Sequence, residues 1–531
     1  MTTLRQLLLD RVDDDRPGLA TRRRTWSWAE HVRESNARAT MLRSLLDDDR
    51  PPHVGVLLDN TAEMVMALSG AALGGHVVVG LNTTRRGDSL LADIRTGDCQ
   101  LVLSDATHAG LLDGLDLEGV RVIRVDGDEW LELVAEARTS PGFEAQAPER
   151  LRTSTSGESL FMLIFTSGTS GEPKAVRVTH EKVWFPGSVL ADMLSITRED
   201  VLYVSMPLFH SNAVMSGYGL ALATGATLAL AERFSASAFL DDVRHFGATY
   251  MNYVGKPLSY ILATPEREDD ADNPLRLAFG NEANEKDVAA FASRFGCEVR
   301  DGFGSTENAV VISRVEGTPP GSLGRPLEGV KVLNRDSGEE CPPAAFGPEG
   351  EVTNLDECVG ELVNTQGAGQ FAGYYNDEAA TAERMRGGMY WSGDLAYLDA
   401  DGFAYYAGRT GDWLRVDGEN LAAAPVERIL LRHPGISRVA VYAVPDTHAG
   451  DQLVAALVLL PGSHLDPGSF EEFLAGQADL GPKQWPRFVR IAPTLPQTAT
   501  NKVLKRELVE QGLDVADPVW VRDERGTSYS G

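Results

Sequence analysis

A segment rich in hydroxyl groups and glycine directly follows an apolar run near residue 165. It reads FTSGTSGEPK over residues 165–174 and ends on Lys174. Backbone N–H groups of a glycine-rich turn point into one concavity, and hydroxyl and ammonium groups add further donors, so the segment suits a phosphate. A P-loop requires Ser or Thr directly after Gly-Lys, whereas here Pro173 precedes the lysine and Ala175 follows it. The alternative is a flexible polar loop after a buried strand.

Further polar motifs follow this segment in a fixed order. They are DGFGSTEN (301–308), YWSGDL (390–395), GRTGDWLRVDGENL (408–421) and PQTATNKVLKR (496–506). Taken together, the motifs resemble those of the adenylate-forming superfamily, which includes acyl-CoA synthetases, luciferases and the adenylation domains of peptide synthetases. The resemblance covers nearly the full chain. Four segments are most similar to the fatty-acyl-CoA ligase branch, which includes fatty-acid transport proteins and steroid-side-chain ligases: PLFHSN (207–212), NYVGKPLSYIL (252–262), AFGNEA (278–283) and GRTGD (408–412).

The resemblance implies a two-step reaction on a small-molecule carboxylic acid, a fatty acid or a steroid side-chain acid. The carboxylate attacks the α-phosphorus of ATP, giving an acyl-adenylate and pyrophosphate, and a thiol, usually that of coenzyme A, then displaces AMP. One alternative passes the acyl group to an amine, and another uses ATP to activate nitrite and diazotise an arylamine. A third, a degenerate scaffold protein, disagrees with the intact motifs.

Three catalytic residues are implied by the resemblance. Lys502 matches the family's C-terminal catalytic lysine, although Asn501 replaces the glycine that usually precedes it. Glu307 would bind Mg²⁺, which prefers carboxylate and phosphate oxygens, and Thr306 would donate to the α-phosphate. At an effective dielectric of ~20, one charge pair at ~4 Å is worth roughly 4 kcal/mol, so losing Lys502 is expected to cost on the order of a thousandfold in rate. The neighbouring Lys505 is expected to lie at the surface.

The other implied nucleotide contacts form three groups. Residues of the opening segment would bind the β- and γ-phosphates and later pyrophosphate: Thr166, Ser167, Gly168, Thr169, Ser170, Gly171 and Lys174. Two segments would line the adenine, with Phe303 stacking on its ring: Gly280, Asn281, Glu282, Asp301, Gly302, Phe303 and Gly304. Asp394 would accept the ribose hydroxyls, and Arg409 would reach the ribose or the phosphates. The alternatives are ordinary ones, since a lone Phe is more often core and an Asp after Gly is often a turn.

An acyl pocket and a hinge are also implied. His210, Met215 and Val254 would line the pocket, although a buried structural histidine explains His210 as well. Gly411 would be the hinge, because glycine tolerates broad changes in φ and ψ. Movement about it would present first Lys502 and then a thioester-forming face, with the segment Gly418, Glu419 and Asn420 turned toward the thiol tunnel.

The pattern of apolar runs indicates the elements that must position these residues. Short apolar strands alternate with helical segments in residues 1–150, which predicts a largely parallel sheet with crossover helices, and further strands followed by helical or loop segments continue to residue 280. The predicted strands are 53–58, 76–81, 100–105, 161–165, 201–208, 226–231, 248–254 and 275–280. After residue 413 the expected order changes to a helix (424–433), two strands (438–444 and 452–460), a second helix (468–476) and a strand (487–491), which is a small α+β unit.

The expected fold class is therefore α/β, with a large N-terminal lobe of parallel and mixed sheets and a small mobile C-terminal α+β domain, as in the acyl-CoA synthetase fold. Residues 1–408 would form the adenylation domain that binds ATP and the acyl group, residues 409–412 the hinge, and residues 413–531 the mobile domain. A chain of 531 residues exceeds what one hydrophobic core usually supports, in agreement with this division.

Composition limits the partners and the compartment. The net charge of −28 argues against sequence-independent binding to nucleic acid or to anionic lipid. The four cysteines lack metal-ligand spacing, which favours free thiols in a reducing compartment. The N-terminus lacks a signal peptide's long apolar run, and the uncharged stretches near 64–81 and 203–231 are interpreted as buried core rather than membrane spans. We expect a cytoplasmic monomer or homodimer that uses ATP, Mg²⁺ and coenzyme A.

Overall fold

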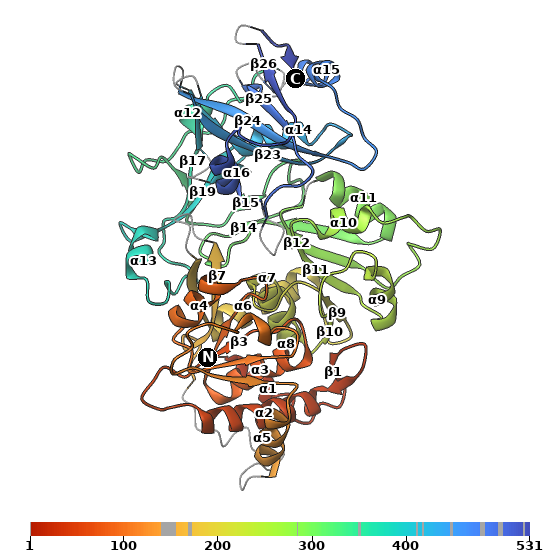
Figure 1. The fold of residues 1–531 in the computed structure, drawn as a ribbon, viewed down its shortest axis with the longest axis vertical. Helices are drawn as coiled ribbons and strands as arrows, with labels where there is room; N and C mark the ends of the chain where they lie inside the picture. Colours follow the sequence, from red (N-terminus) through yellow and green to blue (C-terminus); the bar gives the residue numbers. More distant parts are fainter. Residues whose placement is uncertain are drawn as a thin grey trace. The chain divides into compact units, whose positions relative to one another are not determined.

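The computed structural model of the chain is a mixed α/β structure that divides into two compact units (Figure 1). It describes residues 2–139, 155–167, 173–283, 285–348, 352–409, 413–416, 419–446, 450–477, 480, 484–497, 503–523 and 526–531. Unit 1 consists of Met1–Asn308 and Gln370–Glu383, and unit 2 consists of Ala309–Gly369 and Arg384–Gly531. The predicted hinge at 409–412 falls within the range of unit 2 and stays a prediction.

Unit 1 contains two mainly parallel sheets. The first has the order β13 (Glu298–Gly302), β12 (Leu277–Asn281), β11 (Tyr250–Val254), β9 (Val201–Val204), β10 (Thr227–Leu230), β1 (Pro17–Ala20) and β2 (Thr25–Ser27). The second has the order β6 (Arg121–Arg124), β5 (Leu101–Ser104), β3 (His53–Val56), β4 (Val77–Gly80), β7 (Leu160–Ser167) and β8 (Pro173–Thr179). Only β2 and β8 run antiparallel to their neighbours in these ladders, so the carboxyl ends of the other strands share an edge.

Helices connect and cover these strands (Figure 1). They are α1 (Leu4–Leu9), α2 (Trp28–Leu45), α3 (Ala62–Gly74), α4 (Gly87–Thr96), α5 (Asp128–Thr139), α6 (His180–Leu194), α7 (Ser211–Ala213), a π-helix (Val214–Gly219), α8 (Leu220–Thr224), α9 (Phe239–Phe246), α10 (Pro257–Leu262) and α11 (Glu285–Phe295). Thr179 caps α6 by accepting a hydrogen bond from Lys182 N, and Ser27 forms a capping box at α2 with Glu30.

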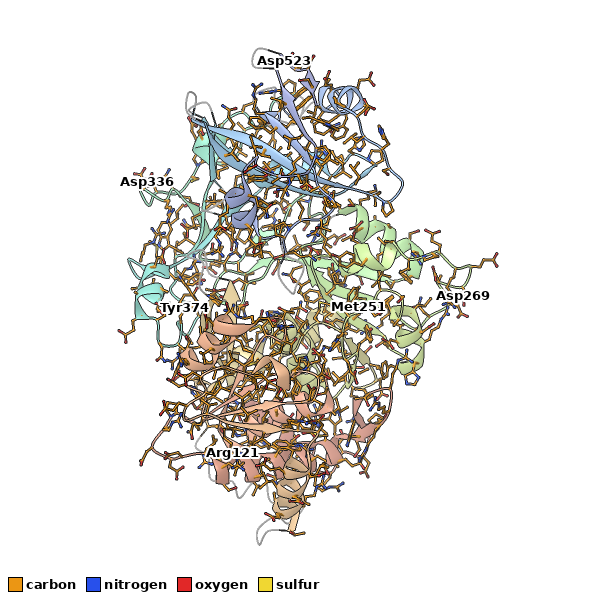
Figure 2. The ribbon with its side chains drawn as sticks, viewed as in Figure 1. Arg121, Met251, Asp269, Asp336, Tyr374 and Asp523 are labelled. Atoms are coloured by element: carbon orange, nitrogen blue, oxygen red, sulfur yellow. The ribbon has the colours of Figure 1, made fainter. Side chains whose placement is uncertain are left out.

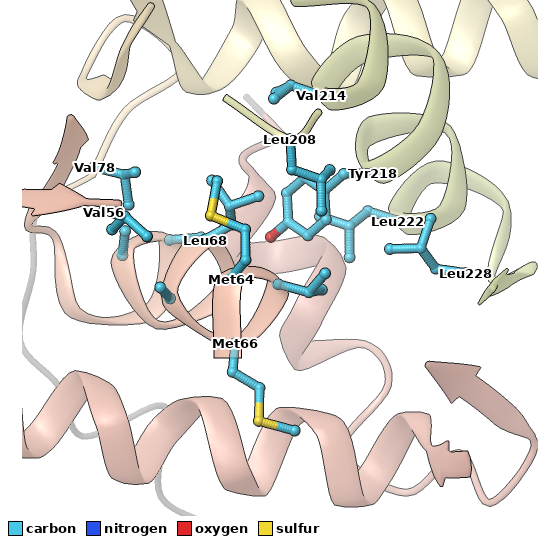
Figure 3. Packing of buried hydrophobic residues seen from close by; sticks show 14 of the residues in the cluster. Val56, Met64, Met66, Leu68, Val78, Leu208, Val214, Tyr218, Leu222 and Leu228 are labelled. Atoms are coloured by element: carbon cyan, nitrogen blue, oxygen red, sulfur yellow. The ribbon is translucent and has the colours of Figure 1, made fainter. Parts of the chain in front are cut away.

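The main hydrophobic core of unit 1 lies between its sheets and helices. Figure 3 shows Met64 and Leu68 of α3 beside Leu208 and Tyr218, all of which belong to one buried cluster. The two uncharged stretches contribute to this cluster, as predicted for core elements. No helix of the described part of the chain is long and apolar enough to cross a membrane.

Unit 2 contains antiparallel and mixed sheets. In one, β16 (Val330–Leu333), β17 (Gly360–Asn364), β19 (Met389–Leu398) and β18 (Met385–Arg386) lie in order, and β20 (Ala404–Arg409) also pairs with β19. Another has the order β22 (Glu419–Ala422), β21 (Trp413–Val416), β24 (Gly450–Leu459), β25 (Phe488–Ile491), β26 (Val519–Arg522) and β27 (Tyr529–Ser530), and β23 (Ile436–Asp446) also pairs with β24. The short ladder β14 (Ile312–Ser313) and β15 (Arg325–Pro326) and the helices α12 (Leu355–Cys358), α14 (Ala423–Leu430), α15 (Pro467–Ala475) and α16 (Lys505–Gln511) complete the unit.

One stretch returns from unit 2 to unit 1. Residues 370–383 lie between two stretches of unit 2 along the chain but belong to unit 1. Their backbone pairs with β8: Arg177 N donates to Gly373 O at 3.1 Å, and Tyr375 N donates to Ala175 O at 2.8 Å. Helix α13 (Glu378–Arg384) ends the stretch. The strand that follows the glycine-rich segment therefore gains a partner from a distant part of the sequence.

The structure confirms the predicted order of strands and helices. The C-terminal elements α14, β23, β24, α15 and β25 coincide with the predicted ones to within a few residues. The strand predicted over 53–58 is shorter in the structure, because β3 ends at Val56; Leu57 and Leu58 are buried beyond its end, and Leu57 N still donates to Leu103 O of β5 at 2.8 Å. The four cysteines are free, as predicted.

Candidate active site

The glycine-rich segment joins two antiparallel strands. The register of β7 and β8 pairs Thr166 with Lys174 and Ser167 with Pro173, and the Thr166 hydroxyl donates to the Lys174 carbonyl at 3.5 Å. The ladder is regular from Met162 to Ser167, so the two strands are paired up to the residues that flank the segment. The tip, with Gly168, Thr169, Ser170 and Gly171, lies outside the described residues, as does the side chain of Ser167.

Lys174 has an aromatic and an acidic neighbour. Its Nζ lies 5.4 Å from the centroid of the Tyr374 ring and 3.7 Å from Glu383 Oε2. Both partners come from the returning stretch 370–383. The ammonium is therefore held at the base of the hairpin by residues of this returning stretch.

Glu307 is held at two points, one on its side chain and one on its backbone. The hydroxyl of Tyr374 donates to Glu307 Oε1 at 2.8 Å, and the ammonium of Lys182 donates to the Glu307 carbonyl at 2.8 Å. Burial lowers the pKa of Lys182 to about 8, while the negative charge of Glu307 acts in the opposite direction. Since the Tyr374 hydroxyl is neutral, its bond fixes the carboxylate without cancelling the negative charge that a cation would need.

Thr306 lies beside a residue from a different part of the sheet edge. Its hydroxyl is 2.9 Å from the hydroxyl of Ser211, which begins α7 after β9. The next residue, Asn212, donates from its side chain to the Tyr253 carbonyl of β11 at 3.3 Å. The loops after β9, β11 and β13 therefore converge at the carboxyl ends of parallel strands, where ligands bind in open α/β sheets.

Asp301 connects the two segments predicted to line the adenine. Its Oδ2 accepts from the Tyr253 hydroxyl at 2.9 Å and from the backbone N–H of Ala283 at 3.1 Å. Gly280 lies against Tyr253, because a Cβ at this position would be 2.2 Å from the Tyr253 carbonyl oxygen. The structure thus brings Gly280, Asn281 and Glu282 beside Asp301 and Gly302, which pair across β12 and β13. Phe303 is half-buried and follows β13, as Gly304 does.

The residues predicted for the acyl pocket lie around the π-helix. Met215 is buried within it, and Val254 ends β11 and packs against the main core. His210 is half-buried with its ring 4.7 Å from Phe209; its Nε2 is buried and has no hydrogen-bond partner among the described residues. Burial lowers the pKa of His210 to about 4, so its ring is neutral at physiological pH. π-helices frequently occur at functional sites.

In unit 2 the predicted ribose ligand is paired with the predicted arginine. Asp394 of β19 and Arg409 of β20 face each other in the register, and Arg409 Nε lies 3.2 Å from Asp394 Oδ1. Asp394 is 4% exposed. The preceding Gly393 has a φ of 75° and donates its N–H to the buried Glu361 at 2.7 Å, which fixes the backbone just before Asp394.

Lys502, Gly411 and Gly418 lie outside the described residues, and only the backbone of Glu419 and Asn420 is described, as part of β22. A bridge between Gln497 and Val503 brackets the segment that contains Lys502. Lys505, which is expected at the surface, is partly exposed, with 19% of its side chain accessible, and its ammonium lies 2.8 Å from Glu427 Oε1. The same oxygen of Glu427 also accepts a hydrogen bond from the Val441 N–H, which fixes the carboxylate beside Lys505.

The donor set at Glu307 fits Mg²⁺ that is shared with phosphates. Among the described residues no group of three or more His, Cys, Asp or Glu side chains could hold a metal ion by itself. Mg²⁺ is usually bound through one or two carboxylates together with substrate phosphates and water, rather than by a cage of protein ligands. A single positioned carboxylate near the hairpin that is predicted to bind phosphates therefore suits this cation.

The sequence analysis missed Tyr374 and Lys182, the two residues that hold Glu307. Tyr374 (labelled in Figure 2) lies in the segment GYYNDE, which was not among the motifs. Lys182 lies in the first turn of α6, is 1% exposed, and reaches the loop that contains Glu307. Neither residue stands in a segment whose pattern marks it as a contact of Glu307.

Two family models match the chain: AMP-binding enzyme over residues 10–375, and AMP-binding enzyme C-terminal domain over residues 425–502. The medium/long-chain-fatty-acid–CoA ligase FadD17 of Mycobacterium marinum is 52% identical, covering 98% of this chain and 99% of that protein. The steroid-22-oyl-CoA synthetase of Rhodococcus jostii is 48% identical, covering 98% and 93%. The structure of the o-succinylbenzoate coenzyme A synthetase MenE of Bacillus subtilis, with ATP and magnesium, has a TM-score of 0.76 at 25% identity, covering 94% and 98%. Its likeness confirms the predicted α/β fold.

Proposed function

The chain belongs to the AMP-binding enzyme family, and from this premise we infer that it is an ATP-dependent acid–CoA ligase that works through an acyl-adenylate. The observation that carries this function is the similarity, at 52% and 48% identity over 98% of the chain, to two proteins named as acyl-CoA ligases. The connection of Lys174 and Glu307 through Tyr374 supports it, because it joins a phosphate-binding hairpin to a cation-binding carboxylate.

The substrate we propose is a large apolar carboxylic acid, either a medium- or long-chain fatty acid or a steroid side-chain acid. The two relatives are named for these two kinds of acid. The buried Met215 and the neutral His210 agree with an apolar pocket. We also propose that the enzyme is located in the cytoplasm and acts as a monomer or homodimer.

In the adenylation step, a carboxylate oxygen of the acid bonds to the α-phosphorus of ATP, and the bond from that phosphorus to pyrophosphate breaks. Thr166 to Lys174 would hold the β- and γ-phosphates, Thr306 would donate to the α-phosphate, and Glu307 would hold Mg²⁺. When bound, Mg²⁺ neutralises charge on the phosphates. Phe303 would stack on the adenine, and Asp394 would accept the ribose hydroxyls. Lys502 would supply the positive charge between the two anions.

In the second step, the thiol sulfur of coenzyme A attacks the acyl carbon and AMP leaves, while the thiol proton passes to solvent or a base. Rotation about Gly411 would exchange Lys502 for the face that carries Gly418, Glu419 and Asn420. The two steps thus depend on different residues, and they can be tested separately.

The test is the variant Lys502→Ala, measured in each half-reaction. Pyrophosphate release with acid and ATP is expected to fall on the order of a thousandfold, because about 4 kcal/mol of charge stabilisation is lost. Thioester formation from supplied acyl-adenylate and coenzyme A should remain largely intact. Lys286→Ala, at an exposed position of α11, serves as the control and should behave as the unchanged enzyme does. Equal loss in both half-reactions would remove the role assigned to Lys502.

A panel of acids separates this function from its alternatives. Thioester formation with fatty or steroid side-chain acids supports the ligase. Pyrophosphate release that depends on the acid but yields no thioester would instead favour an amine acceptor, and release that depends on nitrite would favour diazotisation.

A further inference from the structure

Tyr374 occupies an unusual place in the chain. It lies in the stretch 370–383, which returns from unit 2 to pack with unit 1. Tyr374 forms an antiparallel bridge with Val176, and its neighbours Gly373 and Tyr375 are hydrogen-bonded to the backbone of β8. The residue is therefore fixed to the strand that directly follows the predicted phosphate-binding segment.

Several other bonds make this stretch a rigid support. The hydroxyl of Tyr375 donates to Asp98 Oδ2 at 2.8 Å, and the Asn376 side chain donates to the same oxygen at 3.0 Å. On the other side, the backbone N–H of Tyr374 donates to the hydroxyl of Thr381 at 2.9 Å. Because backbone and flanking side chains are both held, the Tyr374 side chain has a defined direction.

The two ends of this side chain serve two residues that are far apart in the sequence. The hydroxyl donates to Glu307 Oε1 at 2.8 Å, while the face of the ring lies 5.4 Å from the Lys174 ammonium. The ring is 5% exposed, so the cation–π contact is shielded from water, which strengthens it. A single side chain thus sets the positions of an acidic and a basic group.

We propose that Tyr374 is a positioning residue for the adenylation step: its hydroxyl orients the Glu307 carboxylate toward the cation and its ring seats Lys174. This inference rests on the proposed function. A hydrogen bond to one carboxylate oxygen restricts rotation of the carboxylate, so the other oxygen points in one direction. Small misplacements of such groups cost large factors in rate, since reacting groups must be held close to the productive geometry.

The test begins with Tyr374→Phe, which removes the hydroxyl and keeps the ring. The kcat for pyrophosphate formation is expected to fall about tenfold, as for loss of a charge-assisted hydrogen bond, and the half-saturating Mg²⁺ concentration to rise. Thioester formation from supplied acyl-adenylate should not change. As a readout independent of turnover, the increase in melting temperature on adding Mg²⁺ with ATP should become smaller than in the unchanged enzyme.

Tyr375→Phe is the matched control. It removes a tyrosine-to-carboxylate hydrogen bond of the same length, 2.8 Å, from the adjacent residue. If Tyr374 positions Glu307, Tyr375→Phe lowers the melting temperature without changing the Mg²⁺ dependence. The same Mg²⁺ response in both variants would mean that the bonds only stabilise the stretch, and this overturns the proposal.

A double variant tests whether Tyr374 acts through Glu307. Adding Tyr374→Phe to Glu307→Gln should cause little further loss of pyrophosphate formation, because the variant no longer has a charged carboxylate that the hydroxyl could orient toward the cation. Effects that multiply would contradict the proposal. Failure of the proposed function has a different signature, since the unchanged enzyme would then form no acyl-CoA with any acid of the panel.

Discussion

Glu307 in unit 1 and Asp394 in unit 2 are both carboxylates predicted to act on the nucleotide, but they are held in opposite ways. The Glu307 carboxylate accepts from a neutral hydroxyl, and the nearby cation, Lys182, is bound to its backbone carbonyl instead. The Asp394 carboxylate is 4% exposed and forms an ion pair with Arg409. Among the residues that the structure describes, the Glu307 carboxylate forms no ion pair, whereas the Asp394 carboxylate is paired with Arg409.

This difference matches the ligand that each would bind. A divalent cation is attracted by net negative charge, so a carboxylate fixed by a neutral donor serves it best. Ribose hydroxyls are neutral donors, and an oxygen acceptor whose charge is balanced by an arginine can bind them without an extra buried charge. The different surroundings of the two carboxylates thus agree with the different roles proposed for them.

The largest effect is expected from Glu307→Gln. Glutamine keeps the size and the hydrogen-bond acceptor but removes the charge, so pyrophosphate formation should fall about a thousandfold. Initial rates over a range of Mg²⁺ concentrations measure it. The control is thioester formation from supplied acyl-adenylate, which should persist. A loss of less than about tenfold, whatever the Mg²⁺ concentration, would remove the contrast between the two carboxylates.

A smaller effect is expected from Asp394→Asn. Weakening charge-assisted hydrogen bonds to the ribose should lower kcat/KM for ATP about fiftyfold, with little change in the Mg²⁺ dependence. Comparison with 2′-deoxy-ATP makes the test specific. This nucleotide already lacks one of the ribose donors, so the variant should lower kcat/KM less for 2′-deoxy-ATP than for ATP. If the loss is the same for both nucleotides, Asp394 does not bind the 2′-hydroxyl.

The smallest effect concerns stability and the cation beside Glu307. Burial lowers the pKa of Lys182 from 10.5 to about 8. Between these values the unfolded chain binds more protons than the folded chain, so stability rises with pH and is lost as pH falls through the lower value. Relative to Lys182→Met, the free energy of unfolding should therefore increase by about 2 kcal/mol between about pH 7.5 and 9.5.

Urea unfolding of the unchanged protein and of Lys182→Met at the two pH values measures this difference in the free energy of unfolding. The contributions of other titrating groups cancel, because they are the same in both proteins. Lys286→Met, at an exposed position of α11, is the matched control and should show a constant difference. A constant difference for Lys182→Met as well would mean that the folded state does not lower its pKa.

Much of the fold was predictable because apolar periodicity reports burial directly. The strands β3, β4, β5, β9, β10, β11 and β12 lie within the predicted apolar runs, apart from the final residue of β12, Asn281. The differences occur at strand ends, where burial continues beyond the last residue of the strand, as at Leu58, two residues after the end of β3. Periodicity marks which residues are covered, but it does not mark where pairing stops.

The site was predictable only where local motifs carry it. Thr306 and Glu307 are recognised from the residues around them, whereas Tyr374 and Lys182 lie 67 and 125 positions from Glu307. Their roles arise from hydrogen bonds formed across the fold, and a buried lysine or tyrosine leaves no periodic trace in its own segment. Asp394 was predictable from its motif, but its pairing with Arg409 depends on the register of β19 and β20.

The returning stretch 370–383 has a consequence for dissecting the protein. Because unit 1 is completed by residues that follow more than sixty residues of unit 2, no single cut in the gene yields unit 1 whole. A fragment that stops at residue 308 would expose the outer edge of β8 and leave Glu307 without its tyrosine. Any attempt to express unit 1 alone must therefore graft this stretch back.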